Sequence, residues 1–445
     1  MKSGEPFYWG VSSSAAQSEG AADADGKGPS IWDEFSLRKS KIKDHTSIAT
    51  GAGFYHHFRE DLKLISELSI PNFRFSISWP RILPGGTGFL NTKGLDFYDR
   101  LTDSMLEADI TPWATLYHWD LPAALQNRGG WNNREVVSWF SDYADIVTRK
   151  LGDRVLNWMV LNEPMAFTGA GYFLGVHAPG KKGIDSFLSA AHHAALATSM
   201  GAQVIRKNVS KAYVGSTYSQ SAIHPATFSE KDTAAAARVN DLLNLFFVLP
   251  ATGHGYPLQR LKFLRRIEKF IKPGDESQLN AHLDFIGVQT YTREVVSFSH
   301  FVPFVKARMI SAEKRGVKST QMGWEVYPPS IYEVLKQLHS VNGIPDMIIT
   351  ENGAAFEDPL PEHNRINDIE RISYLQSHID MVKKAVDEGV NVKGYFVWSL
   401  TDNFEWAEGY RPRFGLIHVD YKNELKRTIK NSGYWYRDLI QNSKR

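Results

Sequence analysis

Two glutamates that could perform acid–base chemistry stand where predicted strands end. Glu163 lies in the stretch MVLNEP and Glu351 in MIITENG, and each is next to an asparagine. A buried carboxylate costs several kcal/mol unless it is paired or hydrogen bonded. Two carboxylates that face each other across a cleft can cleave a glycosidic bond, because one protonates the leaving oxygen while the other attacks the anomeric carbon or activates water. Ordinary salt bridges or helix caps are the structural alternative.

The elements that must position these carboxylates alternate between strands and helices. Amphipathic spacing predicts helices such as residues 54–69 and residues 369–389, the second ending at a glycine cap, Gly389. Strands are predicted at residues 8–14, 72–79, 111–119, 157–163, 213–219, 283–291, 346–351 and 392–400. Eight such alternations close a barrel, so we predict an α/β fold with one (β/α)8 (TIM) barrel domain over residues 1–445 and long βα loops. A doubly wound open sheet is the competitor, but GVSSSAAQSEG lacks the G-x-G-x-x-G turn.

Polar and aromatic residues gather at the carboxyl ends of the predicted strands, where such barrels carry their chemistry. NFRFSISW (residues 72–79) alternates strictly, so Phe73 and Phe75 should face the helices while Arg74 points into the barrel. An inward arginine needs an anion, and Glu351 is the candidate. We expect the guanidinium to lower the pKa of Glu351 and keep it ionised. A purely structural Arg–Asp pair is the alternative.

Composition excludes several classes of function. The 445 residues are 42% hydrophobic and carry a net charge of +2, which calls for neither a nucleic-acid nor a membrane partner. The absence of cysteine excludes disulfides and thiolate metal sites. We find no stretch of about 18 apolar residues and no signal-like apolar segment near the N-terminus, so a cytoplasmic protein is expected. Adjacent histidines at 56–57 and 192–193 lack ligand spacing, and the basic segment 258–272 is interpreted as a solvated amphipathic helix.

An ordered set of motifs resembles glycoside hydrolase family 1, the β-glucosidase family. The motifs are QSEG (17–20), GKGPSIWDEF (26–35), FRFSISWPRILP (73–84), LYHWDLP (116–122), LNEP (161–164), MGWEVYP (322–328), ITENG (349–353) and WSLTDNFEWAEGYRPRFGL (398–416). The resemblance implies a (β/α)8 barrel that hydrolyses with retention and without a cofactor or metal. It also implies that Glu163 is the acid/base, Glu351 the nucleophile, and Tyr291 a hydrogen-bond donor to that nucleophile.

Sugar recognition needs fixed donors and acceptors together with an aromatic plane. Trp324 matches the leaving-group wall of the family. The candidates that coincide with glycone-binding positions of the family are Gln17, His118, Trp119, Asn162, Trp398, Glu405 and Trp406. A carboxylate at Glu405 would repel a sugar phosphate, so an unphosphorylated glycone is expected. Taken singly, each tryptophan has core packing as its alternative role.

Departures from the family pattern concern selectivity. Gln289 and Thr290 stand where Asn-Tyr is usual. Gln289 keeps the amide with one more methylene, so it is a candidate for substrate binding with a different reach towards the sugar 2-hydroxyl or the nucleophile. Ala16 replaces a common tyrosine and Pro329 a usual glutamate, whereas segments 250–282 and 298–320 match poorly. None of these changes removes a catalytic group.

The sequence therefore predicts a retaining exo-β-glucosidase that acts on small β-glucosides or short oligosaccharides, as in cellulose degradation, with β-galactosidase or β-fucosidase side activity. A non-catalytic carbohydrate-binding barrel and a transglycosidase are the alternatives. The predicted carboxyl separation is about 5–5.5 Å, the retaining geometry. The oligomeric state is left open.

Overall fold

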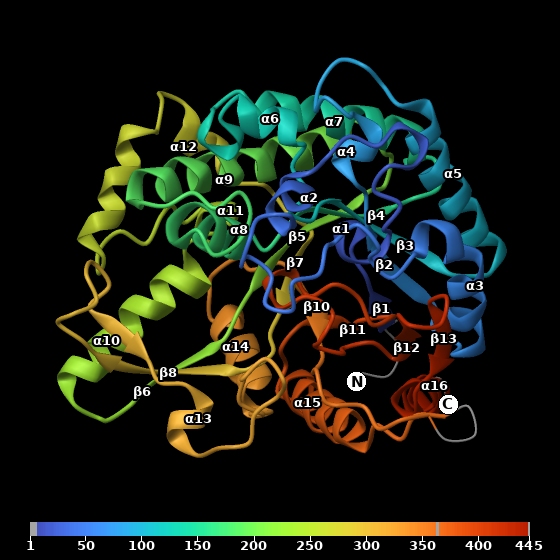
Figure 1. Cartoon of the computed structure of the whole chain (residues 1–445). Coiled ribbons are helices and arrows are strands. Elements are labelled where there is room, and N and C mark those ends of the chain that lie inside the picture. The colour runs from blue at the N-terminus through green and yellow to red at the C-terminus, as the bar shows by residue number, and fades with distance from the viewer. Residues whose placement is uncertain (1–6, 362–364, 444–445) are drawn as a thin grey trace.

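Eight parallel strands close into a barrel in the computed structural model, which describes residues 7–361 and 365–443 (Figure 1). The order around the barrel is β1-β11-β10-β7-β5-β4-β3-β2, and β1 pairs with both β2 and β11. This closure confirms the predicted (β/α)8 architecture. The barrel strands are β1 (Tyr8–Ser12), β2 (Asn72–Ser76), β3 (Thr111–Tyr117), β4 (Asn157–Asn162), β5 (Tyr213–Ser219), β7 (Phe285–Gln289), β10 (Asp346–Asn352) and β11 (Val392–Trp398).

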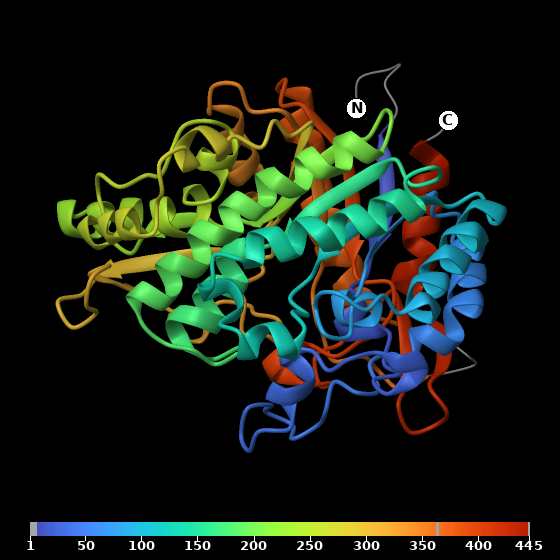
Figure 2. The same cartoon turned by 90° about the horizontal axis from the view of Figure 1, so that it is seen from above.

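Helices cover the outside of the barrel between successive strands, and α7 and α9 run side by side in Figure 2. The helix over residues 369–387 leads to Gly389, whose φ of 91° confirms the predicted glycine cap. The main outer helices are α3 (Phe54–Glu67), α5 (Thr92–Glu107), α7 (Val136–Leu151), α9 (Ile184–Asn208), α14 (Pro329–His339), α15 (Ile369–Asp387) and α16 (Asn431–Ser443).

A layer of large apolar side chains fills the barrel interior below the predicted site. Its fully buried members come from five different strands: Trp113, Met159, Phe285, Ile348 and Phe396. Inward-facing residues of parallel barrel strands stack in such layers, so the barrel is a packed core rather than a pore. Functional side chains can therefore gather only above this layer, at the carboxyl ends of the strands.

Additions to the barrel lie in the long βα loops. A three-stranded sheet of β6 (Ala222–Pro225), β8 (Arg293–Phe298) and β9 (Ala307–Met309) packs against α10 (Glu230–Asn240) and projects from one side of the barrel in Figure 1. A hairpin of β12 (Ile417–Asp420) and β13 (Lys426–Ile429) precedes α16. Across the described part of the chain, no helix has the length and apolarity to cross a bilayer. The prediction that the N-terminal region has no signal-like apolar segment includes residues 1–6, which lie outside the described residues.

Two element predictions need correction. The strand predicted over 72–79 ends at Ser76, because Pro80 and the short helix α4 (Trp79–Ile82) take up the rest of that segment. Trp79 therefore packs on Tyr143 of α7, with ring centroids 4.9 Å apart, rather than on a strand face. The segment 258–272 contains a 3₁₀ helix, Lys262–Lys269, instead of a regular amphipathic α-helix, although its apolar residues Leu264 and Ile267 are buried as expected.

Candidate active site

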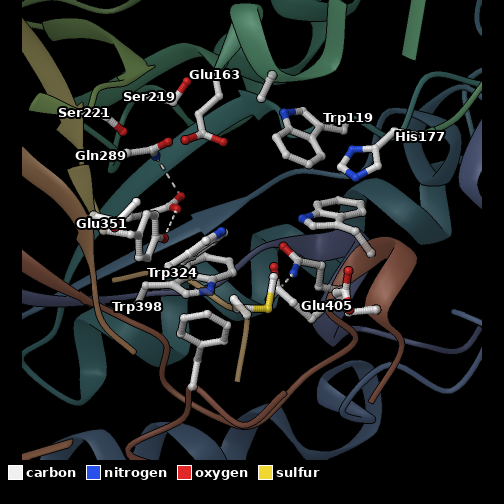
Figure 3. A pocket seen from close by; sticks show the side chains of 18 of the residues that line it. Trp119, Glu163, His177, Ser219, Ser221, Gln289, Trp324, Glu351, Trp398 and Glu405 are labelled. Atoms are coloured by element: carbon white, nitrogen blue, oxygen red, sulfur yellow. Dashed lines mark hydrogen bonds between the residues drawn. The ribbon is translucent and has the colours of Figure 1, made fainter. Parts of the chain in front are cut away.

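The carboxylate of Glu351 lies at the end of β10 and is held from two sides (Figure 3). Arg74 Nη1 donates to Oε1 at 2.5 Å, and Gln289 Nε2 donates to the same oxygen at 2.7 Å. Tyr291 Oη donates to Oε2 at 2.7 Å. The predicted partner of Glu351 is thus confirmed, and the three donors fix the orientation of its carboxylate.

The alternation of β2 explains why Arg74 reaches this carboxylate. Phe73 points outward, with its ring centroid 5.9 Å from that of Phe54 on α3, so its neighbour in sequence must point inward. Arg74 is fully buried, and its Nε lies 3.1 Å from Met159 Sδ in the layer beneath. The guanidinium therefore sits between the apolar layer and the open end of the barrel.

Glu163 ends β4 and begins the short helix α8 (Pro164–Thr168). Its backbone has a left-handed φ of 44°, and such a conformation in a residue other than glycine costs about 1–3 kcal/mol. The backbone N–H is fixed by the carbonyl of Thr217 at 2.9 Å. No described residue donates a hydrogen bond to the side chain, which lines the same cavity as Glu351.

The two carboxyl groups differ in their affinity for a proton. Burial, followed by the negative charge of Glu351, raises the pKa of Glu163 well above its ordinary value. Burial also raises the pKa of Glu351, but Arg74 and the hydrogen bond from Tyr291 oppose that rise. The predicted effect of Arg74, which lowers the pKa of Glu351, is therefore present, but loss of water outweighs it and the net pKa is raised. Glu163 is the group that keeps a shared proton.

Asn162 organises the floor between the two glutamates. Its Oδ1 accepts from Arg74 Nη2 at 2.5 Å, from Gln289 Nε2 at 2.7 Å and from Thr217 Oγ1 at 2.8 Å. Its Nδ2 therefore points to His118 Nε2 at 2.9 Å, which places the imidazole proton on Nδ1. Burial and Arg74 hold the pKa of His118 well below its usual value, so the ring is neutral. Nδ1 is buried and makes no hydrogen bond with a described residue, so this donor is unpaired.

Gln17 and Glu405 form a second polar group in the cavity. Gln17 Nε2 donates to the carbonyl of Phe404 at 2.9 Å and lies 3.4 Å from Glu405 Oε2. Burial, aided by the charge of Glu351, raises the pKa of Glu405 to about 8. Glu405 is therefore mostly protonated at neutral pH, which weakens the prediction that its negative charge repels a sugar phosphate. The described lining contains no lysine or arginine, and it is this lack of a cation that disfavours a phosphate.

Aromatic rings form two walls around these polar groups. Trp119 and Trp406 pack with centroids 4.4 Å apart, and Trp119 Nε1 donates to the backbone carbonyl of Asn162 at 2.9 Å. On the other side, the centroid of Trp324 lies 5.2 Å from that of Tyr291. These walls provide the apolar planes that sugar C–H faces require.

The predicted residues meet in one cavity of about 430 Å³. Arg74 and Asn162 lie buried beneath its surface, and every other predicted site residue lines it: Gln17, His118, Trp119, Glu163, Gln289, Tyr291, Trp324, Glu351, Trp398, Glu405 and Trp406. Figure 3 shows Glu163 and Glu351 on one side of the cavity and Glu405 on another. The arrangement combines a proton donor, a second carboxylate and a polar, aromatic shell for a neutral polyol.

Several lining residues were missed by the sequence reasoning: His177, Ser219, Gln220, Ser221, Thr292, Glu294, Met322, Glu408 and Phe414. Ser219 ends β5, so the rule that strand ends carry chemistry could have found it. Phe414 and Glu408 lie inside a quoted motif. His177 and Glu294 stand in loops or outer strands whose sequence gives no signal of their position.

Charged clusters outside the cavity have structural partners. His192 Nε2 lies 2.9 Å from Asp275, so the second histidine pair includes a structural contact. The ligand atoms of Asp358, Asp402 and His418 lie close enough for a metal, but Lys430 Nζ already contacts Asp358 at 2.6 Å and Asp402 at 2.8 Å. The ammonium group thus supplies the positive charge that these carboxylates need.

Comparisons with known proteins agree with this geometry. The model of the family described as "Glycosyl hydrolase family 1" matches residues 3–445. Beta-glucosidase A of Thermotoga maritima is 42% identical, over 99% of this chain and 98% of the relative. The 1,4-beta-D-glucan glucohydrolase of Thermotoga neapolitana is 41% identical, over 99% and 98%. The solved structure of the Thermotoga maritima beta-glucosidase in complex with deoxynojirimycin superposes with a TM-score of 0.95 at 42% identity, covering 98% of each chain.

Proposed function

The chain belongs to glycosyl hydrolase family 1, and we propose that it hydrolyses β-D-glucosides with retention of configuration, with Glu351 as nucleophile and Glu163 as acid/base. The observation that carries this assignment is the unequal environment of the two carboxyl groups in one cavity. Arg74 and Tyr291 contact Glu351, whereas Glu163 has no such partner among the described residues. Glu351 is therefore the anion, and Glu163 holds the proton.

In the first step Glu351 attacks the anomeric carbon while the proton of Glu163 passes to the leaving oxygen. The glycosidic bond breaks, and an ester forms between the sugar and Glu351. Glu163 is then a carboxylate and takes a proton from water, whose oxygen displaces Glu351 from the anomeric carbon. Each group returns to its starting state. The tyrosine and arginine hydrogen bonds to Glu351 also stabilise it as the leaving group of this second step.

The preferred substrate is an unphosphorylated β-glucoside. The neutral His118 and the protonated Glu405 can each donate to a sugar hydroxyl, and the described lining offers a phosphate no lysine or arginine. We infer that galactosides and fucosides are side substrates and that short β-linked oligosaccharides are natural ones. The relative named 1,4-beta-D-glucan glucohydrolase supports the second inference. A cytoplasmic location stays a prediction from the sequence.

A panel of aryl glycosides tests this proposal: β-glucoside, β-galactoside, β-fucoside and β-glucoside 6-phosphate, with proton NMR to follow the anomer released first. We expect turnover of the plain glucoside with initial release of the β-anomer. The variant Glu351→Gln should lose that turnover while keeping its fold by circular dichroism. Faster hydrolysis of the 6-phosphate than of the glucoside, or release of the α-anomer, would contradict the proposal.

A further inference from the structure

One carboxyl group in the cavity has no role in the proposed chemistry. Glu294 lies near the start of β8, three residues after Tyr291 and opposite Ile223 of β6. It lines the same cavity as Ser221 and Trp324, and Trp324 matches the leaving-group wall of the family. None of the described residues donates a hydrogen bond to its carboxylate or forms an ion pair with it.

The nearby cations are already engaged by another glutamate. Arg293 donates to both oxygens of Glu325 at 2.9 Å, and Arg315 Nη1 lies 2.6 Å from the same carboxylate. Neighbouring strand residues point to opposite faces, so Arg293 and Glu294 cannot share one partner. Burial raises the pKa of Glu294 to about 7, and Arg315 opposes this only in part.

The other carboxyl groups of the lining are accounted for. Glu163 is the proposed proton donor, Glu405 Oε2 lies 3.4 Å from Gln17 Nε2, and Glu351 forms an ion pair with Arg74. Glu408 lies 2.6 Å from Lys43. Glu294 is therefore the carboxyl group of the lining that has no hydrogen bond and no ion pair with a described residue and no role in the proposed chemistry.

We propose that Glu294 sets leaving-group selectivity, favouring aglycones that carry a protonated amine and disfavouring those that carry a carboxylate. A cation on this side of the cavity meets the carboxylate of Glu294 and the electron-rich faces of Trp324 and Phe414, and both attract positive charge. A carboxylate would meet uncompensated repulsion. The proposal rests on the proposed function for its effect on turnover, but its effect on binding does not require catalysis.

Three aryl β-glucosides that differ only in the para substituent provide the test: aminomethyl, hydroxymethyl and carboxylate. Because intrinsic reactivity differs among them, kcat/KM for each is compared between wild type and Glu294→Gln at a pH above the pKa of Glu294. Isothermal titration calorimetry with the matching 1-thio-β-D-glucosides, which resist cleavage, measures the same selectivity in Kd. We expect the preference for the amine over the carboxylate to fall about tenfold or more in Glu294→Gln, the size expected for unit charges a few ångströms apart in a partly hydrated pocket.

Two further variants make the result specific. Glu294→Asp keeps the charge and should keep most of the preference. Glu408→Gln makes the same change in formal charge beside Lys43 and should leave the preference nearly unchanged. An unchanged preference in Glu294→Gln, or an equal loss in Glu408→Gln, would overturn the proposal. If the selectivity proposal fails while wild type still hydrolyses the hydroxymethyl glucoside, the proposed function stands. If wild type does not hydrolyse the hydroxymethyl glucoside, the proposed function is refuted, but the selectivity measured in Kd is unaffected.

Discussion

Replacing Arg74 by methionine tests whether a buried cation keeps the nucleophile ionised. Arg74 is fully buried, and its Nη1 lies 2.5 Å from Glu351 Oε1. Removing one partner of a buried pair costs about 3–5 kcal/mol. At about 1.4 kcal/mol for each pKa unit, the pKa of Glu351 should rise by about 2–4 units. Because attack requires the carboxylate, we expect kcat/KM near neutral pH to fall at least about 100-fold, with the acidic limb of the pH profile moving upward.

The assay is kcat/KM for an aryl β-glucoside measured across the pH range, with thermal unfolding recorded in parallel. Arg81→Met is the matched control, because Arg81 is equally buried and its Nε lies 2.9 Å from Glu19 outside the cavity lining. Both variants should lose stability, but only Arg74→Met should move the acidic limb. Activity within about threefold of wild type and an unmoved limb in Arg74→Met would refute the reasoning.

Three other predictions follow from single contacts. Tyr291→Phe removes the 2.7 Å hydrogen bond to Glu351 and should lower kcat/KM by about 10- to 100-fold, as steady-state kinetics can check. The pKa of Glu405 is raised to about 8, so its contribution to stability is fully present below the pKa it has in the unfolded chain and is lost as pH rises through 8. Glu405→Gln should therefore melt at a higher temperature than wild type in alkaline buffer. Lys430→Met leaves the buried Asp402 without its 2.8 Å partner and should cost about 3–5 kcal/mol in the free energy of unfolding, measured by denaturant titration; a loss under about 1 kcal/mol would contradict that role.

Residue periodicity was enough to anticipate the barrel and the inward arginine. Parallel strands that are buried on both faces must be short and apolar, and side chains alternate along them with a period of two. Phe73 and Arg74 therefore had to face opposite sides wherever the strand lay. The ends of the strands were less certain: Pro80 cannot donate to a strand partner, yet the alternating pattern continued to Trp79 and extended the predicted strand too far.

Sequence by itself determined the chemistry that is possible: two glutamates at strand ends, an arginine beside them, and a shell of amides and tryptophans, in a chain without cysteine. Only the tertiary structure decided which of these groups are protonated at neutral pH. The pKa of Glu351 and that of Glu405 depend on how much water reaches them, and burial comes from segments far apart in the chain. The surroundings of Glu294 also depend on the tertiary structure, because a small sheet outside the barrel brings this residue to the cavity wall. Local spacing fixes the face a side chain points to, but its electrostatic surroundings arise only when the long loops pack together.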